Sequence, residues 1–546
     1  MLKALNKLQN TGYCINEEVF DVYLRCMKLE SGTPFKYEKE TNLEAKRSMK
    51  IEADGIRELA LKNLHNTFYH RYNCDFRGRI YPGTAYLNEQ SSDNAKGLLL
   101  YDHEVPFGDN GEYFLAVHTA NCIGEDKLPL DDRVAFVNDN MEVLIGWAED
   151  PMVNDGWMKT DKAWSTLAAA IEWKKFNQWA FVDGLPKEDF RSALPIFVDG
   201  SNNGVQHLCA LSLDETVAPL VNLDPTAKGA VPGDVYMFIA GKVWERIEEL
   251  NSEIPEEDRE QMSRLVDEVK DIKLRYEKVA ATRKKRDAVY KELVKWRTDN
   301  RELLRKLWPT FWLRVPDKST TRKCVKRPVM TLGYGVTRAG VREQMFDDTK
   351  NLTSDLTYKE KTWVTPMGDL VYDTCYKELP GPAAMLNLFK DLATRANTQN
   401  KFLQWAVPIT NFPVVQAYEE PTKVQVNASF QGQRIQLTVQ KYEKMKLSKK
   451  DQMSGAAPNI VHSFDAAHLT MVVNAADFPT TMIHDSFGCH IGNMDKMFDI
   501  VRQQFIEFYL VDPLKLLLEE LESEDLMPNR GRLDLYDTML SDFAFC

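Results

Sequence analysis

Two short apolar segments of the chain each run directly into an aspartate. In IFVDG the aspartate is Asp199, and in TMIHDS it is Asp485. A short apolar run bounded by turn residues is typical of a buried β-strand, so each segment predicts a strand that carries a carboxylate at its end. If both strands belong to one sheet, the two carboxylates meet at one edge and repel each other unless a cation lies between them.

Such a pair of carboxylates suits Mg²⁺, a hard cation that prefers oxygen ligands and leaves room for water and phosphate. Two such ions about 3.5–4 Å apart would hold the attacking and the leaving oxygen of a phosphoryl transfer. Each aspartate taken alone is more typical of an ordinary turn. The metal prediction therefore depends on the pair and not on either residue.

A third segment, RKCVKRPVMTLGYG, supplies cations. Arg322 and Lys326 are four residues apart and so share one face of a predicted helix, with Tyr334 two further turns along. At about 1.5 Å per residue, the helix from Arg322 to Tyr334 spans roughly 18 Å, about the length of an extended nucleoside triphosphate. Pro328 has no N–H to donate, so the helix is expected to start or kink near it. An Arg/Lys pair on a helix is also typical of a plain surface face.

Composition limits the class of protein. At about 150 residues per domain, 546 residues predict three or four domain-sized units. Hydrophobic residues make up 44% and charged residues 27%, which is typical of a globular fold. The formal net charge is 69 − 81 = −12, so any surface that binds nucleic acid must be a local basic groove on an acidic body.

The sequence indicates an intracellular protein without a membrane partner. No apolar stretch approaches the roughly 18 residues that span a bilayer, and the N-terminal segment lacks the apolar region and cleavage site of a secretory signal. The nine cysteines are scattered singly without a CxxC pair, a pattern typical of reduced thiols.

Apolar periodicity predicts the coarse arrangement of elements. Helices are expected within residues 1–70, 110–182, 233–308, 380–406 and 458–475, strand and loop over 75–100, and a β-hairpin over 412–440. The charged stretch 255–308 has two interpretations: a solvated helical hairpin with i,i+4 ion pairs, or a basic face toward nucleic acid around Arg283, Lys284, Lys285 and Arg286.

Six segments in order resemble the signature segments of the single-subunit DNA-dependent RNA polymerases of phages and mitochondria. They are DFRGRIY with SSDNAKGLL, FVDGSNNGVQHL, RKCVKRPVMTLGYG, APNIVHSFDAAHL, IHDSFG and the terminal SDFAFC. The resemblance implies an α+β right-hand fold. Its expected parts are a helical thumb with a linker remnant (1–65), a palm in two parts (66–230 and 462–546, the second with a C-terminal foot) and helical fingers (231–461) that carry the hairpin 412–440.

The resemblance also implies roles for individual residues. Asp199 and Asp485 match the metal-binding aspartates, and the Gly200 carbonyl matches a further metal contact. Lys326 and Tyr334 match a catalytic triphosphate-binding lysine and the tyrosine that guards the ribose. The remaining matches are to residues near the nucleotide or primer: Arg322 (triphosphate), His462 (2′-hydroxyl), His484 (preceding the second aspartate), Tyr236, Lys127, Arg77 and Arg79.

The implied activity is synthesis of RNA from NTPs on a DNA template with Mg²⁺ as cofactor. Members of the family usually carry several hundred residues before the segment that aligns with Met1, including the domain that opens promoters. We therefore expect a second subunit or a single-stranded DNA-binding factor to serve promoter opening, and favour a naturally short subunit over a truncated chain. A phage origin would place the protein in the cytoplasm of a host bacterium.

Two other functions stay open. A family-A DNA polymerase shares the Arg…Lys…Tyr-Gly helix and two catalytic aspartates, but it places a bulky Glu close behind the first Asp. Here Gly200, Ser201 and Asn202 follow Asp199, and a site with Tyr334 and His462 is able to hydrogen-bond a hydroxyl, which favours RNA. The second alternative is a catalytically inactive scaffold of polymerase shape, which the intact aspartates disfavour.

Overall fold

The computed structural model of the chain has a mixed α+β fold. It describes residues 1–29, 31–225, 231–278, 283–314, 318–349, 361–430 and 433–546. Most of these residues are helical, and the strands form small antiparallel sheets of two or three strands. Among the described residues, no helix combines the length and the apolar character needed to cross a membrane.

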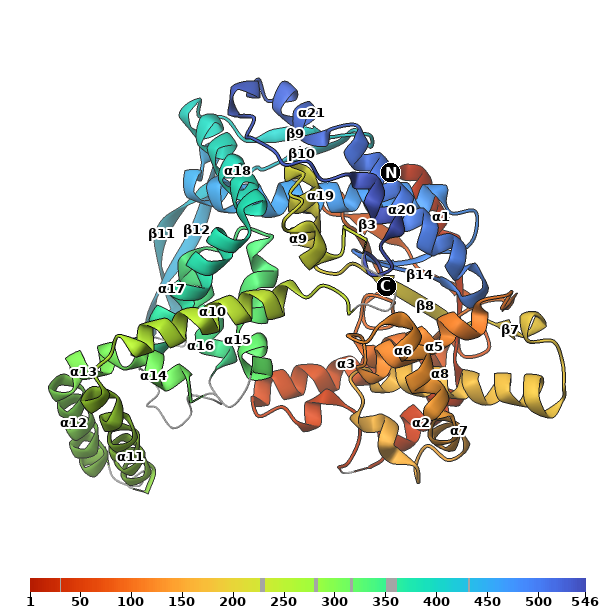
Figure 1. The fold of residues 1–546 in the computed structure, drawn as a ribbon, viewed down its shortest axis with the longest axis horizontal. Coiled ribbons are helices and arrows are strands. Elements are labelled where there is room, and N and C mark those ends of the chain that lie inside the picture. The colour runs from red at the N-terminus through yellow and green to blue at the C-terminus, as the bar shows by residue number, and fades with distance from the viewer. Residues whose placement is uncertain (30, 226–230, 279–282, 315–317, 350–360, 431–432) are drawn as a thin grey trace.

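A three-stranded antiparallel sheet near the centre of the molecule carries both predicted aspartates (Figure 1). Ser486 pairs with Asp199 and Ile483 pairs with Ser486, so Asp485 lies in the turn beside the end of the neighbouring strand. The expectation that the two segments share one sheet is therefore confirmed. The strands, in spatial order, are β13 (Thr481–Ile483), β14 (Ser486–His490) and β8 (Pro195–Asp199).

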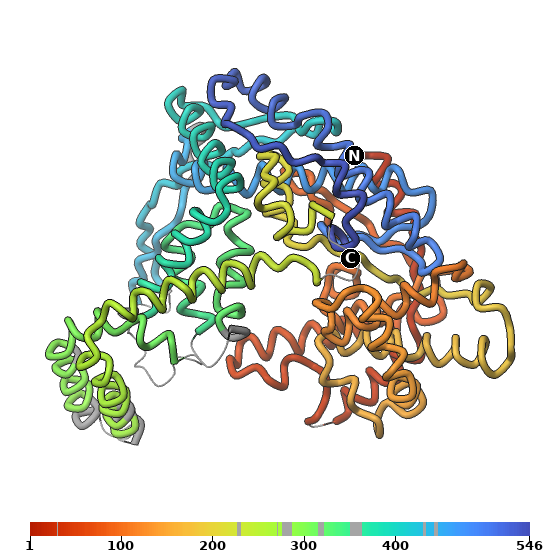
Figure 2. Tube along the Cα trace, in the orientation of Figure 1, coloured from red at the N-terminus to blue at the C-terminus, as the bar shows by residue number. Residues whose placement is uncertain are grey.

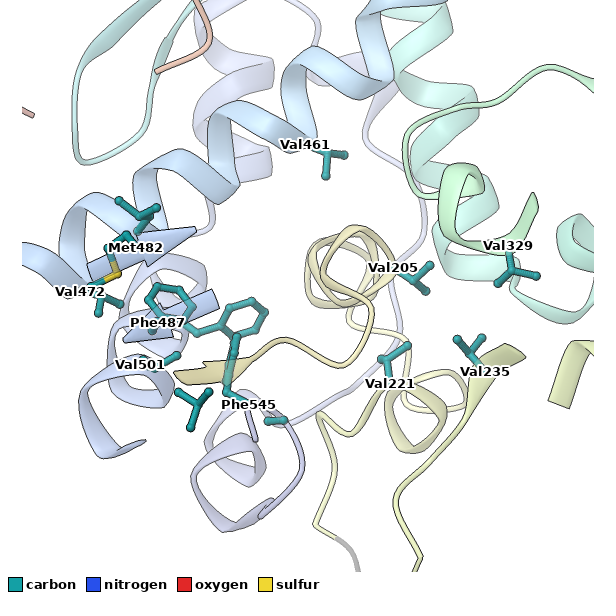
Figure 3. Close-up of a cluster of buried hydrophobic side chains, with 14 of the residues drawn as sticks. Val205, Val221, Val235, Val329, Val461, Val472, Met482, Phe487, Val501 and Phe545 are labelled. Atoms are coloured by element: carbon teal, nitrogen blue, oxygen red, sulfur yellow. The ribbon is translucent and has the colours of Figure 1, made fainter. Parts of the chain in front are cut away.

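A continuous apolar core supports this sheet (Figure 3). Phe487 of β14 is fully buried, and its ring lies 5.2 Å from His468 and 6.1 Å from Phe545, centroid to centroid. Burial of apolar surface provides most of the free energy that holds strand and helices together. The packing helices are α9 (Asn203–Ser212), α19 (Lys449–Ala475) and α20 (Met494–Leu510).

The N-terminal part of the chain combines helices with short strands. Residues 1–70 were expected to be helical, but a strand at 12–15 pairs with strands at 68–69 and 99–101. Four residues are too few for a clear period of two, so periodicity did not reveal this strand. The elements are α1 (Leu2–Gln9), β1 (Gly12–Ile15), α2 (Glu17–Cys26), α3 (Leu43–Asn63), β2 (Phe68–Tyr69), β3 (Tyr72–Cys74), β4 (Ile80–Pro82), α4 (Asp93–Lys96), β5 (Leu99–Tyr101) and β6 (Val105–Pro106).

Two groups of helices flank the central sheet (Figure 1). The first, below the sheet in that view, confirms the helices expected over 110–182, and the second, to the left, confirms those over 233–308. The first group is α5 (Gly111–Ile123), α6 (Leu130–Asp139), α7 (Met141–Glu149) and α8 (Ala163–Asn177). The second is α10 (Val235–Ser252), α11 (Glu256–Lys278), α12 (Arg283–Asp299), α13 (Arg301–Lys306), α14 (Trp308–Trp312), α15 (Lys318–Leu332), α16 (Arg338–Asp348), α17 (Lys361–Glu378) and α18 (Pro380–Thr398).

Helices α11 and α12 form a hairpin that projects from the second group, away from the central sheet (Figure 2). Arg275 binds Asp271 on its own helix at 2.9 Å and Glu292 on the neighbouring helix at 2.7 Å. These pairs agree with the solvated-hairpin interpretation. The side chains of the alternative basic face, Arg283 to Arg286, lie outside the described residues.

The boundaries of the expected hairpin were wrong. Residues 412–415 form β10, which pairs with β9 (Gln404–Val407), and the long hairpin consists of β11 (Glu419–Phe430) and β12 (Gln433–Leu447). The period-two alternation seen in the sequence therefore covers two separate strand pairs, β9–β10 and β11–β12. A turn separates them, in which the Tyr418 N–H donates to the Gln416 carbonyl. Gln416 is buried and outside the long hairpin, and Gln431 lies outside the described residues.

Three helix boundaries also differ from expectation. Helix α15 continues through Pro328 and ends at Leu332, so Tyr334 lies in the turn beyond it. Helix α18 ends at Thr398, and α19 begins at Lys449, nine residues before the expected start at 458. Each error arises at a proline or polar end, where tertiary packing outweighs local propensity.

We predict that Phe487→Ala destabilises the fold by about 3–5 kcal/mol, because it removes a fully buried ring from the core beneath the sheet. The midpoint of thermal unfolding, followed by circular dichroism, measures the change. Phe181→Ala is the matched control, since Phe181 is 60% exposed, and should shift the midpoint little. Equal shifts in both variants would contradict the placement of Phe487 in the core.

Candidate active site

Backbone pairing brings Asp199 and Asp485 to the same edge of the central sheet. Asp199 is the last residue of β8, and the Gly200 N–H donates to the Asp485 carbonyl at 3.2 Å. Asp199 also exchanges both backbone hydrogen bonds with Cys546, at 3.2 and 3.0 Å. These bonds hold the chain on either side of the carboxylates, while Asp199 stays accessible from two neighbouring pockets whose walls partly desolvate it.

The charge of Asp199 raises the free-energy cost of ionising Asp485. Desolvation raises the pKa of Asp199, and the positive charges of Lys162 and Lys96 oppose that rise. Desolvation and then the charge of Asp199 raise the pKa of Asp485 well above its ordinary range. A cation between the two groups would remove this repulsion.

The donor set at this edge fits a hard divalent cation. Two carboxylates are available, and the Gly200 carbonyl accepts one hydrogen bond, from the Asn202 N–H at 2.9 Å, which leaves its second lone pair free. Within the described part of the chain, no cluster of three or more His, Cys, Asp or Glu side chains is arranged for a metal. Any ion here would therefore complete its shell with water or substrate oxygens, as Mg²⁺ commonly does.

Both aspartates lie beside strained backbone. His484, immediately before Asp485, has φ +55°, and Asn202, three residues after Asp199, has φ +103°. Non-glycine residues adopt positive φ only at a cost, and such residues concentrate at functional sites. Sequence reasoning did not anticipate this strain, since neither IHDS nor DGSN specifies a left-handed residue.

A pocket of about 250 Å³ extends from Asp199 to helix α15 and contains six of the residues singled out from the sequence. Arg322 donates to Asp234 at 2.7 Å and lies over the Tyr236 ring, 5.3 Å from its centroid. Lys326 is exposed and forms no ion pair with any described residue. The six are Lys127, Asp199, Gly200, Tyr236, Arg322 and Lys326.

Tyr334 and His462 lie together on another side of the site, with ring centroids 4.5 Å apart. A close approach between two backbones positions Tyr334. A Cβ on Gly333 would lie 2.9 Å from the backbone of Gly204 in α9, and a Cβ on Gly204 would lie 3.0 Å from the Tyr334 ring. A side chain at Gly333 would force the two backbones apart, and one at Gly204 would crowd the Tyr334 ring, so the two glycines allow the turn after α15 to lie against α9.

His462 is held as a neutral imidazole. Arg77 donates to its Nδ1 at 2.6 Å, which leaves the ring proton on Nε2. Burial, together with the charges of Arg79 and Arg77, lowers the pKa of His462 to about 3. The ring therefore presents an N–H donor and no charge at neutral pH.

Two aspartates that sequence reasoning missed orient the arginines. Asp75 accepts from the backbone N–H groups of Arg77 (2.9 Å) and Arg79 (3.1 Å) and pairs with the Arg77 guanidinium at 2.6 Å. Asp465 pairs with Arg79 at 2.6 Å; although burial opposes its ionisation, Arg79 lowers its pKa to about 2. The signal was present, because Asp75 opens DFRGR and Asp465 follows His462 by three residues in HSFD.

His484 packs against an aromatic ring, and its Nδ1 makes no hydrogen bond with the described residues. The ring is that of Tyr81, which lies edge-on with centroids 4.9 Å apart. Burial lowers its pKa. The twelve residues predicted for the site thus lie in three places: at the carboxylate edge, in the α15 pocket and on the Tyr334–His462 side.

Comparisons with known proteins point to one family. A family model described as DNA-dependent RNA polymerase matches residues 105–531. T7 RNA polymerase of Escherichia phage T7 and the DNA-directed RNA polymerase of Enterobacteria phage T3 are each 29% identical over the whole chain, which spans 64% of their length. The mitochondrial DNA-directed RNA polymerase 1 of Arabidopsis thaliana is 30% identical over 93% of the chain and 45% of its own length.

We predict that His462 stays neutral down to pH 5, because its pKa of about 3 lies below the ordinary value of 6.5. Arg77→Gln should raise that pKa, since it removes a nearby positive charge. Nitrogen chemical shifts of ¹⁵N-labelled histidine over a pH titration measure both effects. Arg71→Gln, a change at an exposed arginine six residues away in sequence, is the control; an unchanged His462 titration in Arg77→Gln would contradict the contact.

Proposed function

Because the chain belongs to the DNA-dependent RNA polymerase family, we propose that it synthesises RNA from nucleoside triphosphates on a DNA template. The observation that carries this proposal is the pocket in which Asp199 and Gly200 face Arg322 and Lys326 of α15. It offers oxygen ligands at one end and cations at the other, as the transfer of a nucleotidyl group requires.

The proposed fold is a right hand. The palm would consist of residues 66–230 and 462–546, the fingers of 231–461 and the thumb of 1–65. The pairing of β8 with β14 supports this division, because it joins the two palm segments in one sheet. The position of α15 beside that sheet edge supports the assignment of the second helical group to the fingers.

In the proposed reaction the 3′-hydroxyl of the transcript attacks the α-phosphorus of a bound NTP, and pyrophosphate leaves toward α15. Asp199, Asp485 and the Gly200 carbonyl would hold Mg²⁺, which when bound supplies charge stabilisation and lowers the pKa of the attacking hydroxyl. Arg322 and Lys326 would neutralise the phosphates and orient them. The Tyr236 ring packs against the Arg322 guanidinium, and Lys127 adds a further cation to the pocket.

Selection of ribose would depend on Tyr334 and His462. The neutral His462 presents Nε2–H, and the Tyr334 hydroxyl lies on a ring in contact with it. A pocket that hydrogen-bonds a 2′-hydroxyl disfavours the deoxy substrate, because its polar groups are then left unpaired. No bulky side chain follows Asp199, which is bordered by Gly200 and Ser201.

Two further points stay predictions from the family resemblance. The long hairpin β11–β12 would enter the major groove of a promoter, for which a two-stranded ribbon is suited; Lys423, Gln425 and Arg434 are exposed on it. A second subunit or a single-stranded DNA-binding factor would assist promoter opening.

The deciding experiment is extension of an RNA primer on a DNA template, with NTPs compared with dNTPs. Efficient extension with NTPs alone supports the proposal. A preference for dNTPs would favour the DNA polymerase alternative, and template binding without extension by either substrate would favour the inactive scaffold.

We predict that Asp199→Asn and Asp485→Asn each reduce primer extension at least a thousandfold. Each change removes a charged ligand whose stabilisation of the transition state is worth several kcal/mol. Single-turnover extension rates measure the loss, and circular dichroism checks the fold. Asp155→Asn is the control, since that side chain is exposed and does not line the pocket. Appreciable extension by either site variant would refute the assignment of that aspartate.

We predict that Tyr334→Phe loses sugar discrimination more than rate, because it keeps the ring and removes only the hydroxyl. The ratio of kcat/KM for one NTP to that for its dNTP should fall about tenfold or more. Tyr290→Phe, at a partly exposed position on α12, serves as the control. A ratio equal to that of the unmodified chain would mean that the Tyr334 hydroxyl does not contact the sugar.

A further inference from the structure

Lys162 lies at the reaction centre, although no sequence motif singled it out. It is the N-cap residue of α8, and its backbone N–H donates to the Cys122 carbonyl of α5 at 2.9 Å. Its side chain lines the α15 pocket and also a smaller chamber of about 110 Å³ on the other side of Asp199. Two helices of the first group therefore fix this lysine where the two spaces meet.

Lys162 and Asp199 line the same two spaces, so the ammonium and the carboxylate face common solvent. Although burial disfavours its charge, Cys122 and then Asp199 and neighbouring acids raise the pKa of Lys162. The lysine is thus positively charged at neutral pH and lines the same pocket as Asp199.

The Lys162 ammonium forms no hydrogen bond and no ion pair with any residue that the structure describes. Two other cations of the pocket differ, whereas Lys326 is likewise unpaired among the described residues. Lys127 pairs with Asp126 at 2.9 Å, and Arg322 pairs with Asp234 at 2.7 Å. An ammonium that faces a cleft without a protein partner keeps its three donors available for a ligand.

The α15 pocket has cations on two walls. Arg322 and Lys326 come from α15, and Lys127 and Lys162 come from the opposite wall, next to α5 and α8. A triphosphate carries negative charge on all sides, so cations on one wall of the pocket leave the phosphate oxygens on the other side without a positively charged partner. On the wall opposite α15, Lys127 has an acidic partner, and Lys162 has none among the described residues.

We propose that Lys162 is a substrate-binding residue that contacts phosphate oxygens of the incoming nucleotide, and of the pyrophosphate product, from the wall opposite α15. This inference rests on the proposed function, since it names a contact within the same pocket. It adds a cation that the family resemblance did not assign. The contact would position the α- and β-phosphates beside Asp199, while Arg322 and Lys326 hold the far end.

The test combines substrate kinetics with direct ligand binding. In Lys162→Ala, the KM for NTP and the inhibition constant of pyrophosphate should both rise about tenfold to a hundredfold, the range for hydrogen bonds between charged groups. Lys162→Arg should recover most of the affinity. Calorimetric titration with inorganic tripolyphosphate, without primer, template or turnover, should show the same order of affinities. The dissociation constant for the primer–template should stay unchanged.

Lys159→Ala is the matched control. Lys159 lies three residues earlier in the chain, has a side chain that is 79% exposed, and lines neither space beside Asp199. Tripolyphosphate affinity and NTP KM equal to those of the unmodified chain would overturn the inference, as would weakened binding of primer–template alone, which would assign Lys162 to the nucleic acid. Failure of the unmodified chain to extend any primer would instead refute the proposed function, while the tripolyphosphate titration would still test Lys162.

Discussion

The repulsion between Asp199 and Asp485 is the constraint on which the rest of the site depends. Pairing of β14 with β8 brings the two carboxylates to one sheet edge, where the charge of Asp199 disfavours ionisation of Asp485. A fold gains no stability from such a pair, because uncompensated like charges cost free energy. Under the proposed function, a cation and its substrate would remove this repulsion.

The surrounding core offsets this cost. Phe487 and Phe545 lie beneath the sheet, and helices α9, α19 and α20 bury a continuous apolar surface against it (Figure 3). Strained residues such as His484 and Asn202 persist at the edge because this core determines the backbone around them. The core therefore stabilises the sheet on one face, while the strained backbone and the like charges at its edge cost free energy.

Local sequence pattern predicted the parts of the site that are contiguous in the chain. The strands that end at Asp199 and Asp485 follow from short apolar runs, and the spacing of Arg322 and Lys326 follows from the helical period. Pairings across the chain were not predictable in this way: Arg77 with His462, Arg79 with Asp465, and Gly333 against Gly204 each join segments far apart in sequence. The strand at 12–15 and the true ends of the hairpin were missed for the same reason, since a strand is defined by its partner.

The acidic composition of the chain and its cationic pocket are compatible because acidic residues pair with several cations of the site. In the α15 pocket, Asp234 pairs with Arg322 and Asp126 pairs with Lys127; on the Tyr334–His462 side, Asp465 pairs with Arg79. Such pairs gain little net free energy at a solvent-accessible site, but they reduce the entropy lost when a phosphate binds. Lys326 and Lys162 differ, because neither has a described acidic partner and each faces the pocket from an opposite wall. Oriented cations would thus define where the phosphates lie, and the two unpaired lysines would supply charge that no carboxylate has already neutralised.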